Sequence, residues 1–185
     1  MLSVRAMAAL LGSAVVLATA AMRTPARAAD TVPAPLFLKI VLATVAFDRA
    51  LDAKAGDAVE LTIIGDSAYA GTLRKTLQGA ADKKLKGKNL VLKETTLSAL
   101  ASSGVHIAIF ADSLGGEVAK ASSTCAGKSI TCVAVDTADV EKGIALGVEQ
   151  GADGKPKIVV NLAAAQKAGS DYSSQILRLA RVIGQ

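Results

Sequence analysis

Three acidic residues each come directly after an apolar run typical of a buried strand. Asp66 and Ser67 end LTIIGDS, Asp112 and Ser113 end IAIFADS, and Asp136 ends CVAVD. If the strands are parallel, their carboxyl ends meet at one edge of a sheet, where open α/β folds bind ligands. Carboxylates and hydroxyls there would suit a cation or a small polar ligand. The favoured interpretation is structural, because Asp and Ser after a strand commonly cap the next helix, and the ligand site is the alternative.

His106 is the only histidine in the chain and lies inside the apolar run VHIAIF. A metal cluster built on several histidines is therefore excluded, and no serine or aspartate stands out as a catalytic partner. The glycines of GTLRKTLQG and DSLGGE do not have the spacing of a phosphate-binding loop. We expect a structural histidine, no metal, no cofactor and no enzymatic activity.

Cys125 and Cys132 are the only two cysteines and flank the short segment AGKSIT. In an exported protein such a pair forms a disulfide more often than it remains as two free thiols. Closing so short a loop contributes about 2 to 3 kcal/mol in the chain-entropy description. A structural staple is the favoured interpretation, and a redox switch that joins a helix end to a strand is the alternative.

The beginning of the chain has the layout of a cleaved secretory signal. A basic start at Arg5 leads into an apolar run ending at Met22 and then into the tripeptide ARA, with processing expected before Ala29. A membrane anchor is the alternative, but the run falls short of the ~20 apolar residues that cross a bilayer. We expect residues 1–28 to be a signal peptide and residues 29–185 to form one domain.

The formal net charge of +5 does not indicate nucleic acid as a partner. Three arginines belong to the expected signal peptide, and without them 18 basic residues stand against 16 acidic ones. The sequence has neither an arginine-rich stripe nor an aromatic platform. The lysines of DKKLKGK, residues 82–88, are interpreted as a solvated turn, with contact to an anionic surface as the alternative.

The elements that must position these residues alternate along the chain. Residues 33–51, PAPLFLKIVLATVAFDRAL, have the apolar spacing of a helix. Short apolar strands then alternate with helices, which predicts βαβ units in a mainly parallel sheet with helices on both faces. The expected strands are residues 59–65, 89–96, 105–111 and 129–135, and the helices that follow them are residues 66–82, 97–104, 112–122 and 136–143.

The last third of the chain has a different pattern. Residues 144–161 contain two apolar runs around the turn signal GADGKP, which predicts an antiparallel hairpin at the edge of the sheet. The closing segment predicts two helices separated by Gly169, the second extending to Ile183, each with one buried apolar face. The fold class expected is therefore a single three-layer α/β domain with an antiparallel C-terminal hairpin.

The ending VVNLAAAQKAGSDYSSQILRLARVIG resembles the carboxyl-terminal signature of the YfiR family, a group of small periplasmic proteins also described as a domain of unknown function. In that family a strand ending in I-N-L leads to a helix of small residues, a glycine, a paired serine and then L-L-x-L-A. LTIIGDS, the strand of His106 and the glycine-led hairpin also resemble family segments. The matching positions at the end of the chain are Asn161, Leu162, Ala164, Ala165, Gly169, Ser173, Ser174, Ile176, Leu177, Leu179 and Ala180.

The resemblance covers nearly all of residues 35–184 and has two departures. Cys125 and Cys132 match a pair found in family members, but a second pair of some members aligns with Thr62 and Val105 and is absent here. The Trp-Pro that often ends the first helix is replaced by RALDAK.

The resemblance implies a regulator located in the periplasm. Family members are similar to the component that represses a membrane-bound diguanylate cyclase through its periplasmic sensor domain and so controls cyclic di-GMP and biofilm formation. The implied partner is the periplasmic domain of an inner-membrane diguanylate cyclase or sensor kinase, with a homodimer as a further assembly. The alternative function is that of a small-ligand-binding protein that uses the carboxyl edge of the sheet.

Overall fold

The computed structural model describes residues 31–79 and 84–184, so the expected signal peptide lies outside the described residues. Within those residues, one sheet contains strands β1 (Ala58–Ile64), β2 (Lys84–Leu85), β3 (Lys88–Lys93), β4 (Ile107–Phe110), β5 (Thr131–Ala134), β6 (Leu146–Gln150), β7 (Pro156–Asn161) and β8 (Ala180–Ile183). Their order across the sheet is β2-β3-β1-β4-β5-β6-β7-β8. Only the pairs β2/β3 and β6/β7 are antiparallel, which confirms the expected mainly parallel sheet with a C-terminal hairpin.

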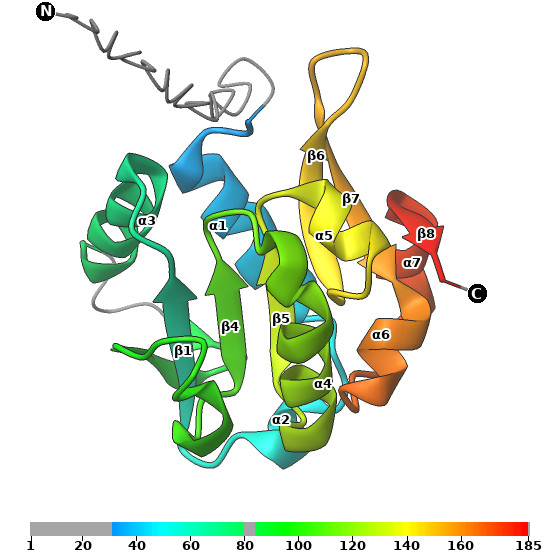
Figure 1. Cartoon of the computed structure of the whole chain (residues 1–185). Coiled ribbons are helices and arrows are strands. Elements are labelled where there is room, and N and C mark those ends of the chain that lie inside the picture. The colour runs from blue at the N-terminus through cyan, green and yellow to red at the C-terminus, as the bar shows by residue number, and fades with distance from the viewer. Residues whose placement is uncertain (1–30, 80–83, 185) are drawn as a thin grey trace, which may run out of the picture.

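Helices cover both faces of this sheet. They are α1 (Ala34–Val45), α2 (Leu51–Lys54), α3 (Ala68–Gln78), α4 (Val118–Lys128), α5 (Thr137–Glu141), α6 (Leu162–Lys167) and α7 (Ser174–Leu179), with 3-10 turns η1 (Leu100–Ser102) and η2 (Gly115–Glu117). Figure 1 shows α4, α5 and α6 in front of the sheet and α1 behind it. In the residues that the structure describes, no helix is long and apolar enough to span a membrane.

The central strands separate two hydrophobic clusters because successive side chains point to opposite faces. On β4, Ile107 and Ile109 join the cluster beneath α1 and α3, whereas Ala108 and Phe110 join the cluster beneath α4. All four residues of β4 are buried, as expected for a parallel strand covered on both sides. This double burial explains why the strand reads as a continuous apolar run.

The closing segment differs from the expectation of two helices. The second helix, α7, ends at Leu179, and Ala180–Ile183 is strand β8, parallel to β7. The hairpin β6/β7 is therefore not at the edge of the sheet. Leu179 is also 74% exposed, so the expectation that this helix buries its leucines is wrong at that position. The physical reason is that β7 offers unpaired backbone groups, and an extended Ala180 lets the chain pair with them.

Three other expected elements are shorter than predicted or of another type. The first helix ends at Val45, and a separate short helix follows from Leu51. The expected helix over residues 97–104 contains only the 3-10 turn η1. Among the described residues of the lysine segment, Lys86 and Gly87 form a two-residue hairpin turn with φ of 52° and 80°. Positive φ at both positions is typical of a type I′ turn, so this segment is an edge hairpin rather than a simple solvated turn.

Candidate functional site

A cleft lies where the order of the strands reverses. From β1 the chain moves to β3 on one side and then returns to β4 on the other side. Such a reversal leaves a crevice beyond the carboxyl ends of the two strands, where ligands bind in open α/β folds. A cavity of about 820 Å³ is present there, which we call the carboxyl-edge cleft. The cleft is lined by Ser67, Asp112, Ser113 and Asp136, whereas Asp66 is exposed and is not part of the lining.

The cleft also contains residues that the sequence did not indicate. The aromatic rings of Phe37 and Tyr69 meet edge to face, with centroids 6.2 Å apart. The Tyr69 hydroxyl donates a hydrogen bond of 2.7 Å to the carbonyl of Val32, and burial raises the pKa of this tyrosine. The tyrosine thus stays a neutral donor that holds the segment before α1 against the cleft. The remaining lining residues are Thr31, Ala111, Val135, Thr137, Val148, Glu149 and Gln150.

Asp112 connects the ends of β1 and β4. Its Oδ2 accepts hydrogen bonds from the backbone N–H groups of Asp66, at 2.8 Å, and Ser67, at 3.3 Å. Gly65, with φ of +135°, brings this backbone close to the carboxylate. The aspartate therefore shapes the cleft as well as lining it.

Two other residues that line the carboxyl-edge cleft cap helices. Ser67 Oγ accepts from the N–H of Ala70 at the start of α3, and Asp136 Oδ1 accepts from the N–H of Ala138 at the start of α5. These contacts match the structural interpretation of the strand ends. No group of three or more His, Cys, Asp or Glu side chains that could hold a metal ion is found within residues 31–79 and 84–184.

Asp139 is a buried carboxylate beside the cleft that the sequence did not mark out. Its Oδ2 accepts a hydrogen bond of 2.7 Å from the N–H of Leu114, in the loop after β4, and its Oδ1 has no partner among the described residues. Burial raises the pKa of Asp139 above its ordinary value of 3.8, and the Leu114 N–H opposes this effect. Asp139 therefore anchors the rim loop at an electrostatic cost when it is ionised.

Asp139→Asn is expected to make the protein more stable at pH 7 and to have a smaller effect near pH 4. The pKa of Asp139 is higher in the folded protein than in the unfolded chain, so as pH rises above about 4 the unfolded chain loses this proton first. The free energy of unfolding of the wild-type protein therefore falls as pH rises from about 4 toward 7. Asparagine keeps an acceptor for Leu114 and removes the buried charge. Melting temperatures at both pH values test this, with the exposed Asp57→Asn as control. A variant less stable than wild type at pH 7 would contradict it.

Cys125 and Cys132 form a disulfide, as expected from the sequence. Their Cα atoms are 6.1 Å apart, and the bond joins the last turn of α4 to β5. His106, on the neighbouring strand end, accepts a hydrogen bond of 3.0 Å at Nδ1 from the backbone N–H of Glu60. Both features lie at the amino ends of the parallel strands, away from the carboxyl-edge cleft.

The C-terminal signature residues mostly make structural contacts. Asn161 is buried; its Oδ1 accepts from the N–H of Ala164, and its Nδ2 donates to the carbonyl of Val140 at 2.9 Å. Gly169 ends α6 with φ of +66°. Ser173 and Ser174 stand at the start of α7, Leu177 packs partly against the core, and Ala180 begins β8.

Asn161→Ala is expected to lower the free energy of unfolding by about 2 kcal/mol. The substitution removes a helix cap, worth about 1 kcal/mol, and a buried side-chain hydrogen bond of similar value. Chemical denaturation checks this. Asn89→Ala, at the other asparagine of the chain, is the control, because that side chain is exposed and should change stability very little. Equal effects of the two substitutions would contradict the assignment.

The fold and the cleft define an α/β domain with a crevice at the reversal of its strand order. The chain belongs to the YfiR/HmsC-like family, whose model matches residues 39–181. This family is periplasmic and is not known as a family of enzymes, so membership supports a periplasmic regulatory role in general. No curated protein matches the chain.

Solved structures share the fold at low sequence identity. A conserved domain protein from Vibrio cholerae has a TM-score of 0.55 and 13% identity over 81% of this chain. The ABC domain in complex with L-Trp from Streptococcus pneumoniae has a TM-score of 0.52 and 17% sequence identity over 82% of this chain. A substrate-binding protein with adhesive properties from Clostridium difficile has a TM-score of 0.50 and 14% sequence identity over 72% of this chain. This chain spans only 60%, 60% and 57% of their respective lengths, so the likeness concerns the fold alone.

Proposed function

We propose that this protein is a non-enzymatic periplasmic repressor of an inner-membrane signalling protein. Its partner would be the periplasmic domain of a diguanylate cyclase or sensor kinase, and its output would be a lower cellular concentration of cyclic di-GMP and less biofilm. The observation that carries the proposal is the family match over residues 39–181. Residues 1–28 would act as the signal peptide, leaving residues 29–185 as the exported domain.

Repression across a membrane requires that the protein binds two states of its partner with different affinity. A regulator with equal affinity for both states would shift nothing, however tightly it bound. The proposed repressor therefore binds the inactive state of the periplasmic sensor domain more tightly. A signal acts by weakening that preference.

Overproduction tests the direction of this effect. The full chain, with its signal, is expected to lower cyclic di-GMP and surface attachment, whereas a chain starting at Ala29 after an initiator methionine is expected to change neither. Both forms must be present at similar amounts by immunoblotting. A fall in cyclic di-GMP with the unexported form would contradict action from the periplasm.

The carboxyl-edge cleft favours a second candidate function, the binding of a small ligand. Its volume of about 820 Å³ and its position at the strand reversal are those of ligand sites in α/β folds. A thermal-shift screen of small metabolites tests it, since a ligand of the native state raises the melting temperature. The shift should disappear in Ser113→Trp, which fills the cleft, and persist in Ser98→Trp, at an exposed position outside it.

A further inference from the structure

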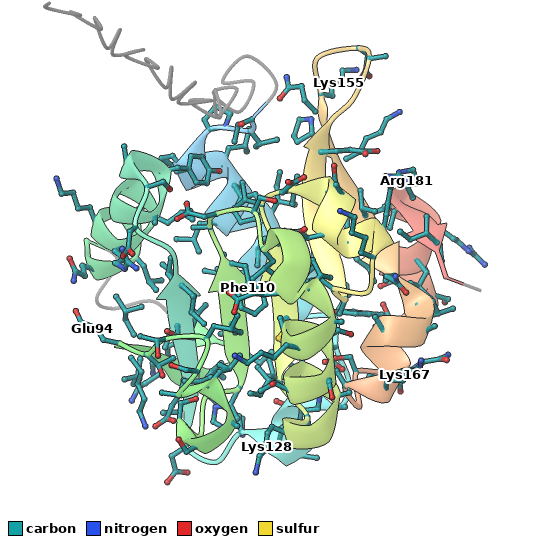
Figure 2. All side chains as sticks on the ribbon, in the orientation of Figure 1. Glu94, Phe110, Lys128, Lys155, Lys167 and Arg181 are labelled. Atoms are coloured by element: carbon teal, nitrogen blue, oxygen red, sulfur yellow. A yellow bond between two sulfur atoms is a disulfide. The ribbon has the colours of Figure 1, made fainter. Side chains whose placement is uncertain are left out.

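A second pocket lies at the opposite edge of the sheet from the carboxyl-edge cleft. It has a volume of about 270 Å³, and we call it the amino-edge pocket. Figure 2 shows Lys128 at the lower end of the molecule, away from the end toward which β1 and β4 point in Figure 1. No carboxylate belongs to the lining that the described residues provide. The lining residues are Lys54, Leu100, Ala101, Gly104, Val105, His106, Lys128, Ser129 and Ile130.

His106 contributes a hydrogen-bond donor whose position is determined by its backbone contact. Nδ1 accepts the Glu60 N–H, so in the neutral imidazole the proton must be on Nε2. The structure shows no partner for Nε2 within residues 31–79 and 84–184. The backbone of His106 is tied in turn to the disulfide-bonded segment, because its carbonyl accepts a hydrogen bond of 2.9 Å from the N–H of Thr131.

Lys128 and Ser129 belong to the loop that the disulfide closes. Ser129 has φ of 55°, a left-handed conformation that ends α4 and turns the chain toward β5. The N–H of Ile130 donates to the carbonyl of Cys125 at 2.9 Å, which tightens the same turn. The disulfide therefore holds the backbone of Lys128 and Ser129 beside the start of β5, the strand that pairs with the strand following His106.

Lys54 forms a wall of the pocket, but its charge is already compensated. Its Nζ donates to the carbonyl of Ala168 at 2.9 Å and lies 3.9 Å from Oδ2 of the buried Asp48. A Cβ atom at Gly169 would lie 3.6 Å from Lys54 Cε and 3.7 Å from Ser129 Oγ. Gly169 therefore lies between Lys54 and Ser129. Because the charge of Lys54 is compensated, Lys128 is the cation of the pocket that can attract a ligand.

We propose that the amino-edge pocket binds a small oxyanion of the phosphate or sulfate type. The donors would be the Nε2–H of His106, the hydroxyl of Ser129 and the ammonium of Lys128, three residues that line the same pocket. Charge-assisted hydrogen bonds from an ammonium to an oxyanion are stronger than neutral ones, so Lys128 supplies most of the attraction. The volume leaves room for a short organic group on the oxyanion, as in glycerol phosphate.

The residues that line the carboxyl-edge cleft support an anion site at the amino edge rather than at the carboxyl edge. The carboxyl-edge cleft is lined by Asp112, Asp136 and Glu149 and by no basic residue among those described. Arg181 compensates the charge of Glu149, but the two aspartates would still repel an oxyanion. The linings of the two pockets therefore differ in the sign of their charged residues. Anion binding at the amino edge is independent of the proposed partner, and it can be measured on the purified domain.

Titration of inorganic phosphate into the isotope-labelled domain, at constant ionic strength, tests the proposal by NMR. Saturable shifts are expected at the amide signals of Ser129, Ile130 and His106, with the same signals moving for glycerol phosphate if the organic group is accommodated. Lys128→Gln is expected to weaken phosphate binding about tenfold, the loss of one strong charge-assisted contact. Lys120→Gln, with the same charge change two turns earlier on α4, should leave the affinity unchanged.

His106→Asn gives a second, independent variant, because the asparagine Oδ1 lies near the position of Nδ1 and can accept the Glu60 N–H, whereas no atom replaces Nε2. It is expected to weaken phosphate binding several-fold while the melting temperature stays near that of wild type. Three results would overturn the proposal: no saturable shift at the pocket with phosphate, equal weakening by Lys120→Gln and Lys128→Gln, or unchanged affinity in a folded His106→Asn variant.

Discussion

Gly65→Ala is expected to lower the free energy of unfolding by about 3 to 5 kcal/mol. Gly65 has φ of +135°, where an alanine is strained by about 1 to 3 kcal/mol. An added Cβ would also lie 2.8 Å from Oδ2 of Asp112, which must then move. Its hydrogen bonds to the N–H groups of Asp66 and Ser67 would be lost, each worth about 1 kcal/mol.

Chemical denaturation of Gly65→Ala, with Gly71→Ala as the matched control, separates this local effect from a general effect of losing a glycine. Gly71 lies within α3, and a Cβ there meets no atom within 4 Å. Gly71→Ala should therefore stabilise the protein slightly through helix propensity. A ligand found for the carboxyl-edge cleft should bind Gly65→Ala less tightly. Equal stability of the two variants would contradict the assigned role of Gly65.

Loss of the disulfide is the second large expected effect. The chain-entropy description predicts that closing the loop between Cys125 and Cys132 stabilises the fold by about 2.5 kcal/mol, so the double substitution Cys125→Ser with Cys132→Ser should cost that amount. The reduced wild-type protein should unfold at nearly the same denaturant concentration as this variant. The variant should not respond to reductant, which controls for other effects of the reagent.

The mass of the exported protein tests whether the bond forms in the cell. Intact mass should lie about 2 Da below that of the reduced protein, because two hydrogens are lost when the S–S bond forms. Equal masses, or equal stability of the oxidised and reduced forms, would contradict the staple. A redox switch would further require that partner repression changes when the bond is reduced.

Local patterns in the sequence were sufficient for most of the central sheet. The runs at β1, β4 and β5 were predicted because parallel strands buried on both faces are mostly apolar along their whole length, as IAIF illustrates at Ile107–Phe110. The edge of the sheet at which Asp112 and Asp136 lie was predicted because a parallel sheet brings strand ends together. The disulfide was predicted because an exported protein with a single cysteine pair usually forms a disulfide from it.

The rest of the structure depended on contacts between distant residues. Ala180–Ile183 follows a leucine-rich stretch without a turn residue, and only the free edge of β7 makes it a strand. Phe37 reaches the carboxyl-edge cleft from a helix that precedes every strand, which no local pattern reveals. Lys54 and Gly169 lie far apart in sequence and meet only because α2 packs beside the end of α6.

The most direct test of the proposed function is the concentration of cyclic di-GMP in cells that lack this gene. Three strains should be compared: the deletion, the deletion with the full chain restored, and the deletion with a chain that lacks residues 1–28. Repression from the periplasm predicts a rise in cyclic di-GMP on deletion that only the full, exported chain reverses. Unchanged cyclic di-GMP on deletion, or reversal by the unexported form, would contradict repression from the periplasm.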